Sequence, residues 1–247
     1  MAAEIIVNGI ILSGMPIGEA DKRVVILTKE MGRMSAFVRG AKRMTSPLGA
    51  RTRTFAFGQF TLSPGRTAYT VARAEISEYF EDIVKDVEKT AFGCYFLELA
   101  QDFARENTDE SELTELVYRT LKALSDERIA HQLTRRIFEL KLLQMNGLSP
   151  DLSVCCVCRK PLVEGRFKPS LMQAVCTDCE PEDNGFYLSR SALYAYNFIR
   201  TTRLQSLYTF AVRDDVLSQL SYVSDRILMH VWDREPESRK MLEVLIN

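Results

Sequence analysis

The spacing of hydrophobic residues changes about a third of the way along the chain. In residues 1–80 the β-branched and aromatic residues form short runs that turn-forming residues separate. Five such runs, in about eighty residues, predict a small closed or partly open β-barrel. The expected strands cover residues 5–12, 24–28, 33–38, 54–62 and 67–76.

From residue 81 the hydrophobic residues recur at helical spacing. Helices are expected at 88–106, 112–124 and 128–146, from a cap at Ser189, and at 214–232 and 237–246. Gly147 is placed as a C-terminal stop. The pattern predicts an α+β multidomain chain in which a cysteine-rich segment is inserted into an all-α bundle. The predicted segments are a barrel (1–80), a first part of the bundle (81–148), the insertion (149–183) and a second part of the bundle (184–247).

The third expected strand has one apolar face and one cationic face. Side chains alternate across a strand, so Met34, Ala36 and Val38 share the face that belongs in a core. The opposite face carries Arg33, Ser35, Phe37 and Arg39. An aromatic ring between two guanidinium groups is typical of a platform for single-stranded nucleic acid, where arginine neutralises phosphate and the ring stacks a base. The alternative is that Phe37 packs under a loop and the arginines are simply solvated.

Charge is segregated along the chain, although the formal net charge is −1. Residues 1–80 hold 11 Lys+Arg against 6 Asp+Glu, a net of +5. No acidic residue lies between Glu30 and Glu75. Such asymmetry predicts a polyanionic partner on the basic side. The cations of that stretch are Arg33, Arg39, Lys42, Arg43, Arg51, Arg53, Arg66 and Arg73. Four of them, Lys42, Arg43, Arg51 and Arg53, fall in residues 40–53, which we expect to form an exposed and mobile loop.

Two CxxC pairs form the most specific motif in the sequence. Cys155 and Cys158 are separated by 17 residues from Cys176 and Cys179. That spacing is typical of a zinc site with four thiolate ligands, which leaves no open position for water or substrate and is therefore structural. Free thiols or disulfides are the alternative. Cys156 could replace Cys155 only through a tighter CxC loop. Cys94 is expected to be a buried small hydrophobe.

Several classes of protein lack support in the sequence. There is no signal peptide, and no apolar run is long enough to span a membrane, which predicts a cytoplasmic location. There is no phosphate-binding loop and no dinucleotide-binding fingerprint. The two histidines, His131 and His230, are expected in the middle of helices and do not belong to a deaminase motif. Asp214 and Asp215 are explained by the first turn of a helix, where negative charge is favourable. Catalysis is not expected.

Four short stretches carry a resemblance to a known family. Residues 18–33 read GEADKRVVILTKEMGR and residues 39–43 read RGAKR. Residues 138–143, FELKLL, are followed by GLSP at 147–150, just before the first CxxC. The chain resembles the bacterial RecO recombination-repair proteins in these stretches and in the order of barrel, helix and cysteines. One departure is that MQAV at 172–175 replaces the paired glycines of the family before the second CxxC.

The resemblance implies an N-terminal OB-fold barrel, a helical domain with a structural zinc and a non-enzymatic role. That role is binding single- and double-stranded DNA, annealing complementary strands, and helping RecA replace single-strand-binding protein. The implied partners are RecR and the acidic C-terminal tail of single-strand-binding protein, on the nucleoid in the cytoplasm. A pocket for that tail should combine a cation with a hydrophobic hole. Its candidate cations are Arg135, Arg136, Arg200 and Arg203.

Two other functions compete with this hypothesis. A barrel with a zinc scaffold also suits an RNA-binding or ribosome-associated protein, and a titration of DNA against RNA would separate the two. A metal-dependent nuclease would need an open metal site, for which Asp214 is the best candidate.

Overall fold

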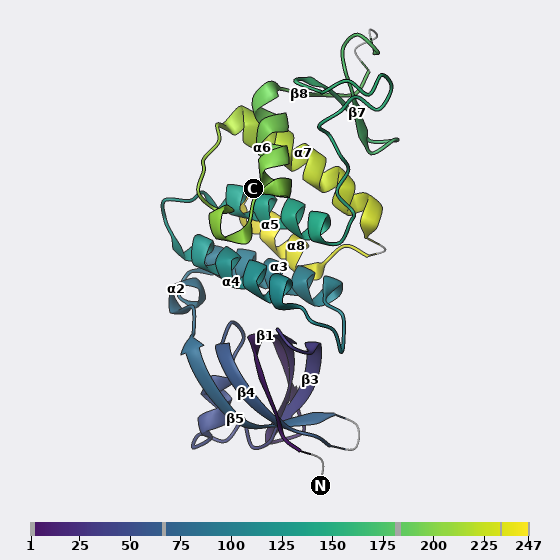
Figure 1. The fold of residues 1–247 in the computed structure, drawn as a ribbon. Helices are drawn as coiled ribbons and strands as arrows, with labels where there is room; N and C mark the ends of the chain where they lie inside the picture. Colours follow the sequence, from purple (N-terminus) through teal and green to yellow (C-terminus); the bar gives the residue numbers. More distant parts are fainter. Residues whose placement is uncertain (1–2, 66–67, 181–183, 233, 247) are drawn as a thin grey trace. The chain divides into compact units, whose positions relative to one another are not determined.

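The computed structural model describes residues 3–65, 68–180, 184–232 and 234–246. They form two compact units, one of Met1–Ser125 with Pro236–Asn247 and the other of Asp126–Glu235 (Figure 1). Each unit is described by itself below. The division into four segments expected from the sequence stays a prediction.

A closed five-stranded barrel opens the chain. Its strands follow one another around the barrel in the order β1-β2-β3-β5-β4. They pair in antiparallel fashion except for β3 and β5, which run parallel. This is the predicted α+β architecture, with the OB-fold barrel first. The strands are β1 (Ile5–Ile17), β2 (Asp21–Thr28), β3 (Gly32–Val38), β4 (Phe57–Ser63) and β5 (Tyr69–Glu78).

The barrel is filled by the apolar face of each strand. In β3 buried residues alternate with half-buried ones, and Met34, Ala36 and Val38 point inward as predicted. Inward-facing residues of the other strands complete one contiguous apolar core, which removes the strands' hydrophobic surface from water. The further core residues are Val7, Ile11, Val24, Ile26, Ala56, Phe60, Leu62, Val71 and Ala74.

Strand β1 is longer than predicted because it continues through Pro16 to Ile17. Only its first part, up to Ile10, pairs with β4, whereas its second part pairs with β2 alone. At Pro16 the edge of β1 that would face β4 is therefore unpaired. Proline, which has no N–H to donate, is tolerated at such an unpaired strand edge. The predicted turn is confined to residues 18–20.

Other details of the barrel also differ from the prediction. Residues 40–53 contain a short helix, α1 (Pro47–Arg51), which begins with a proline in its first turn. Strand β4 begins three residues later than expected, because Phe55 adopts the left-handed region with φ of 72°. Phe55 and Ala56 are buried, and their backbones hydrogen-bond Ile11 of β1.

Four helices complete the first unit. The turn between β2 and β3 is fastened to the segment that follows α3, where the Arg33 N–H donates to the carbonyl of Arg105 at 2.8 Å. A side chain at Gly32 would place its Cβ only 2.1 Å from that same oxygen, so this close approach requires glycine. The helices are α2 (Glu81–Val84), α3 (Val87–Phe103), α4 (Ser111–Ser125) and α8 (Glu237–Ile246).

The second unit combines helices with a small sheet. Ser189 caps α6 as predicted, accepting from the Ala192 N–H at 3.3 Å, and Gly147 ends α5 with φ of 71°. The three short strands lie in the order β7-β6-β8. The helices are α5 (His131–Met145), α6 (Arg190–Thr201), α7 (Asp214–Val231) and the 3-10 turn η1 (Leu204–Ser206). The strands are β6 (Gly165–Lys168), β7 (Gln173–Val175) and β8 (Phe186–Leu188).

Two expectations about single residues are wrong. Cys94 is exposed rather than buried, because it occupies a position of α3 that faces solvent while Phe92, Gly93 and Tyr95 face inward. His131 is the first residue of α5, and His230 lies in the last turn of α7, so neither is in the middle of its helix.

Candidate functional site

The four predicted cysteines come together in the second unit. Cys155, Cys158, Cys176 and Cys179 place their sulfur atoms within 4.8 Å of one another. The Cys158 and Cys176 sulfurs are 3.8 Å apart. Cys156 is not a member of this cluster, and its N–H instead donates to the Ala174 carbonyl at 3.0 Å.

Each CxxC pair lies on a tight turn that aims its two sulfurs in one direction. In the first turn the Arg159 N–H donates to the Cys155 carbonyl at 3.0 Å, and Arg159 has a φ of 63°. In the second the Cys179 N–H donates to the Cys176 carbonyl at 3.1 Å. Met172, at the departure from the family pattern, also has a positive φ, 49°. The turn before β7 therefore forms without glycine, at the cost of a backbone region that side chains disfavour.

The thiols of the cluster differ in acidity. Burial opposes ionisation of Cys155, but N–H groups of Cys158, Cys176 and Val157 donate to its sulfur and lower its pKa to about 6. Hydrogen bonding to the sulfurs of Cys176 and Cys158 raises the pKa of Cys179 to about 12. Four sulfurs this close cannot all ionise unless a cation offsets their charge.

The geometry of the cluster suits a metal ion. A tetrahedral ion with metal–sulfur bonds of about 2.3 Å separates its sulfurs by about 3.8 Å, the spacing of Cys158 and Cys176. All four donors are cysteine sulfurs, so no position is left for a reacting molecule. The cluster could hold a metal ion whose role is structural.

The barrel carries a separate surface, formed by one row of outward-facing residues. Met15 pairs with Arg23, Arg23 pairs with Phe37, and Phe37 pairs with Thr70 across β1, β2, β3 and β5. Met15 and Arg23 are exposed and Phe37 is half-buried. The Arg39 guanidinium lies 5.4 Å from the centre of the Phe37 ring. The row thus sets the cationic side chain of Arg23 between the apolar side chains of Met15 and Phe37, with Arg39 beside the Phe37 ring.

Asp21 fastens two loops at one end of this row. Its carboxylate accepts from the Gly40 N–H at 2.8 Å and from Arg39 at 2.6 Å. The Gly40 N–H and the Arg39 side chain together lower the pKa of Asp21. Lys42 donates to the Gly18 carbonyl at 3.2 Å, and Arg43 is exposed nearby. The loops after β1 and β3 therefore present their cations together. We call this surface the β2–β3 face, made of Met15, Arg23, Phe37, Arg39, Lys42 and Arg43.

Four of the nine predicted DNA-binding residues belong to the β2–β3 face, namely Phe37, Arg39, Lys42 and Arg43. Arg33 lies elsewhere, where its guanidinium donates to the Gln101 carbonyl at 2.9 Å and pairs with Glu106 at 3.2 Å. Arg53 pairs with Glu81 at 3.3 Å and stacks on Tyr79. The roles of these arginines in DNA binding stay predictions.

The remaining predicted cations lie around β5. Arg51 donates to the Ala74 carbonyl of β5 at 3.2 Å, and Arg73 is exposed on the same strand. Arg66 lies outside the described residues.

Sequence reasoning missed Arg23 and Met15. Arg23 is in β2, where Val24 and Ile26 are buried, so the alternation used for the third strand would also have placed it outward. Met15 carried no such signal, because the first strand was expected to end at residue 12.

The arginines considered for a peptide pocket are divided by burial. Arg135 and Arg136 are buried and both donate to the buried carboxylate of Glu139, at 2.8 and 2.9 Å. They are therefore not available on the surface. Arg200 pairs with Asp151 at 3.2 Å, and Arg203 is exposed.

An apolar hollow of about 540 Å³ lies elsewhere in the second unit, between α6 and the residues that lead into α7. Three aromatic side chains line it, those of Tyr194, Phe198 and Phe210. Arg190 and Arg213 also line this hollow. Among the described residues no helix is long and apolar enough to cross a membrane.

Comparison with known proteins covers nearly the whole chain. Residues 1–80 match the family model described as "Recombination protein O N terminal", and residues 84–240 match "Recombination protein O C terminal". The DNA repair protein RecO of Acetivibrio thermocellus is 30% identical over 90% of this chain and 89% of its own length. The RecO protein of Clostridium perfringens is 28% identical over 96% of this chain and 97% of its own. The chain belongs to the RecO family of DNA repair proteins, which are non-catalytic recombination mediators.

Proposed function

We propose that this chain binds single- and double-stranded DNA through the β2–β3 face and anneals complementary strands. We further propose that it acts with RecR to help RecA load onto DNA coated by single-strand-binding protein, on the nucleoid in the cytoplasm. The observation that carries the proposal is the β2–β3 face itself. Four cations and two apolar side chains share one outer surface of the barrel, and OB-folds bind oligonucleotides on the corresponding strands.

The chemistry of this face suits annealing. Guanidinium and ammonium groups neutralise phosphates without reading sequence, and this lowers the repulsion between two strands. Phe37 and Met15 offer apolar surface for a base face, while the hydrogen-bonding edge of the base stays free to pair. None of these steps consumes a nucleotide, so annealing of bare strands should not need ATP.

The salt dependence of binding tests the assignment of this face. If Arg23, Arg39, Lys42 and Arg43 each neutralise one phosphate, log affinity for single strands should fall with log salt at a slope of about −2.8. Reversing Lys42 and Arg43 to Glu should remove at least half of that slope and weaken binding about tenfold or more at low salt. Fluorescence anisotropy with a labelled oligonucleotide measures both quantities.

A matched control separates local contacts from net charge. Lys85 and Lys240 are exposed cations of the same unit, and both lie in ordinary surface ion pairs on helices. Reversing them to Glu changes the net charge equally and should leave the slope nearly intact. An unchanged slope in the Lys42/Arg43 variant, or tighter binding of RNA than of DNA in competition, would contradict the proposal.

We propose that the metal of the cysteine cluster is zinc. Four thiolates in two CxxC turns are the donor set that structural zinc prefers. Cys155, Cys158, Cys176 and Cys179 would hold the ion and so fix the ends of β6 and β7. Bound zinc would supply the positive charge that lets all four thiols ionise.

The apolar hollow of the second unit suits the tail of single-strand-binding protein. That tail is acidic and ends in an apolar residue, so its pocket needs a cation beside a hydrophobic hole. Arg190 and Arg213 supply the cations, and the rings of Tyr194, Phe198 and Phe210 supply the hole. Tyr194 is 72% exposed and its ring lies 6.5 Å from that of Phe198, so the two rings form accessible apolar surface in the hollow. We therefore place the proposed tail pocket here rather than at Arg135 and Arg136.

A further inference from the structure

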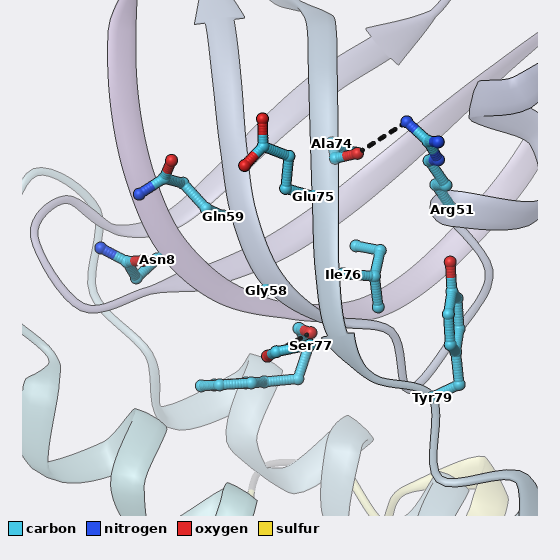
Figure 2. A pocket seen from close by; sticks show the side chains of 10 residues that line it. Asn8, Arg51, Gly58, Gln59, Ala74, Glu75, Ile76, Ser77 and Tyr79 are labelled. Carbon is cyan, nitrogen blue, oxygen red and sulfur yellow. Dashed lines mark hydrogen bonds between the residues drawn. The ribbon is translucent and has the colours of Figure 1, made fainter.

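The outer surface of β4 and β5 contains a second hollow, away from the β2–β3 face. Its volume is about 560 Å³, within the range of sites that hold small ligands. Figure 2 shows its side chains, with Gln59 and Glu75 on neighbouring strands and Arg51 and Tyr79 beyond β5. It is lined by Asn8, Arg51, Phe57, Gly58, Gln59, Ala74, Glu75, Ile76, Ser77 and Tyr79.

Three polar side chains form a row across this hollow. Asn8 of β1 pairs with Gln59 of β4, and Gln59 pairs with Glu75 of β5. The Asn8 side chain is occupied, because its amide donates to Glu30 at 2.8 Å. Gln59 and Glu75 are exposed, and neither side chain has a hydrogen-bond or ion-pair partner among the described residues. An amide and a carboxylate therefore stand side by side and free to bind.

A cation and apolar surface flank this pair. Arg51 is exposed and uses one of its N–H groups on the Ala74 carbonyl, one residue from Glu75 (Figure 2). Guanidinium carries further N–H donors, which remain free to bind an anion. Ile76, Phe57 and the Tyr79 ring supply the apolar lining. The hollow thus offers an acceptor, an amide, an apolar wall and a cation within one volume.

We propose that this hollow binds an unpaired guanine base whose phosphate contacts Arg51. Guanine presents two adjacent N–H donors, N1–H and the N2 amino group, which one carboxylate can accept together. The other bases present a donor beside an acceptor, so they offer a carboxylate only one such bond. Directly opposite residues of a sheet lie about 5 Å apart, so the Gln59 amide can donate to the guanine O6 while Glu75 holds N1–H and N2–H.

The path of β5 connects this hollow to the DNA surface proposed above, and the inference rests on that proposed function. Thr70 of β5 pairs with Phe37 in the β2–β3 face, and Glu75 lies five residues further along the same strand. That separation is about 17 Å, which a few nucleotides of an extended strand can cover. Arg73 is exposed between the two positions and carries no ion pair among the described residues. A strand bound at Phe37 can therefore continue past Arg73 and place a base in the hollow.

Base preference tests this inference. We expect the full chain to bind an alternating thymine–guanine oligonucleotide about fivefold to tenfold more tightly than an alternating thymine–cytosine one of equal length, which likewise cannot pair with itself. Glu75→Gln should abolish that ratio, because an amide accepts at only one of the two positions. Guanosine monophosphate is then added as a competitor of the bound oligonucleotide, with adenosine monophosphate as the control. Displacement by guanosine monophosphate alone would show that the hollow also accepts the free nucleotide.

Controls keep the outcome tied to the hollow. Glu75→Gln also removes a negative charge, so Glu112→Gln on α4 serves as the variant of equal charge and should keep the preference. Reversing Lys42 and Arg43 should weaken both oligonucleotides equally and leave their ratio unchanged. Equal affinity for the two oligonucleotides in the unaltered protein, with no competition by guanosine monophosphate, would overturn the inference while leaving DNA binding itself intact. Failure to bind either oligonucleotide would instead refute the proposed function.

Discussion

The β-sheets of the two compact units are stabilised in different ways. The barrel of the first unit combines five paired strands, of 7 to 13 residues each, with one contiguous apolar core. The sheet of the second unit has strands of only 4, 3 and 3 residues, too short to be stable as a sheet on their own. Four cysteines gather beside it instead. A small sheet can thus depend on a metal where a barrel depends on burial.

The burial of charged residues also differs between the two units. In the second unit Glu139 is fully buried and accepts from Arg135, Arg136 and Ser224, so these charges serve the structure. On the barrel, the Arg39 side chain is 68% exposed although it pairs with Asp21. An exposed pair is worth little to stability and can exchange partners with a phosphate. Buried charge organises the second unit, and exposed charge is available for binding on the first.

Loss of the proposed zinc should give the largest effect. Cys176→Ser removes one of the four ligands, and structural zinc contributes roughly 10–16 kcal/mol of apparent folding energy in small peptides. We expect the variant to lose its bound metal and residues 155–180 to lose protection from hydrogen exchange, while the barrel stays folded and binds single-stranded DNA with unchanged affinity. Metal analysis and hydrogen exchange measure the two parts.

Cys156→Ser is the matched control, because Cys156 lies between two ligands without belonging to the cluster. It should keep one metal per chain. Equal metal loss in both serine variants, or collapse of DNA binding in Cys176→Ser, would break the distinction between the two units.

Removal of the buried carboxylate should rank second. Glu139→Gln keeps the shape of the side chain but removes the negative charge that the buried guanidinium groups of Arg135 and Arg136 share. Breaking a buried pair from one side costs about 3–5 kcal/mol. The urea midpoint of the second unit should fall accordingly.

Glu115→Gln is the control, since Glu115 makes an i,i+4 pair with Arg119 on α4 but is 31% exposed. This substitution should cost only about 0.3–0.5 kcal/mol. Equal losses in the two variants would contradict a structural role for buried charge.

The smallest effect should come from Asp21. Its pKa lies below the usual 3.8 because the folded protein favours the ionised form through Gly40 and Arg39. The contact therefore contributes to stability at pH above about 4 and is lost as the pH falls through the lowered pKa. In Asp21→Asn the Gly40 amide should exchange faster at neutral pH, and its exchange should no longer respond to acid through this group. Amide exchange followed by NMR at several pH values measures both, and an unaltered Gly40 rate would show that Asp21 does not hold the loop.

Local rules predicted those features that depend on neighbours in the sequence. Alternation placed Met34, Ala36 and Val38 inside the barrel, and spacing selected the four cysteines over Cys156. The cap at Ser189 and the stop at Gly147 were predicted for the same reason. Each of these depends on the geometry of a single strand, turn or helix end.

Contacts between distant segments decided the rest. Whether Pro16 ends a strand depends on where β4 stops pairing with β1. Arg33 and Arg39 lie at opposite ends of β3. Arg33 contacts the end of α3 and Glu106, whereas Arg39 pairs with Asp21. The row from Met15 to Thr70 exists only because four strands pair in register. The sequence by itself determined the periodicities and the ligand spacing, because those are short-range; the tertiary structure decided which charges stay exposed, because that depends on what folds against them.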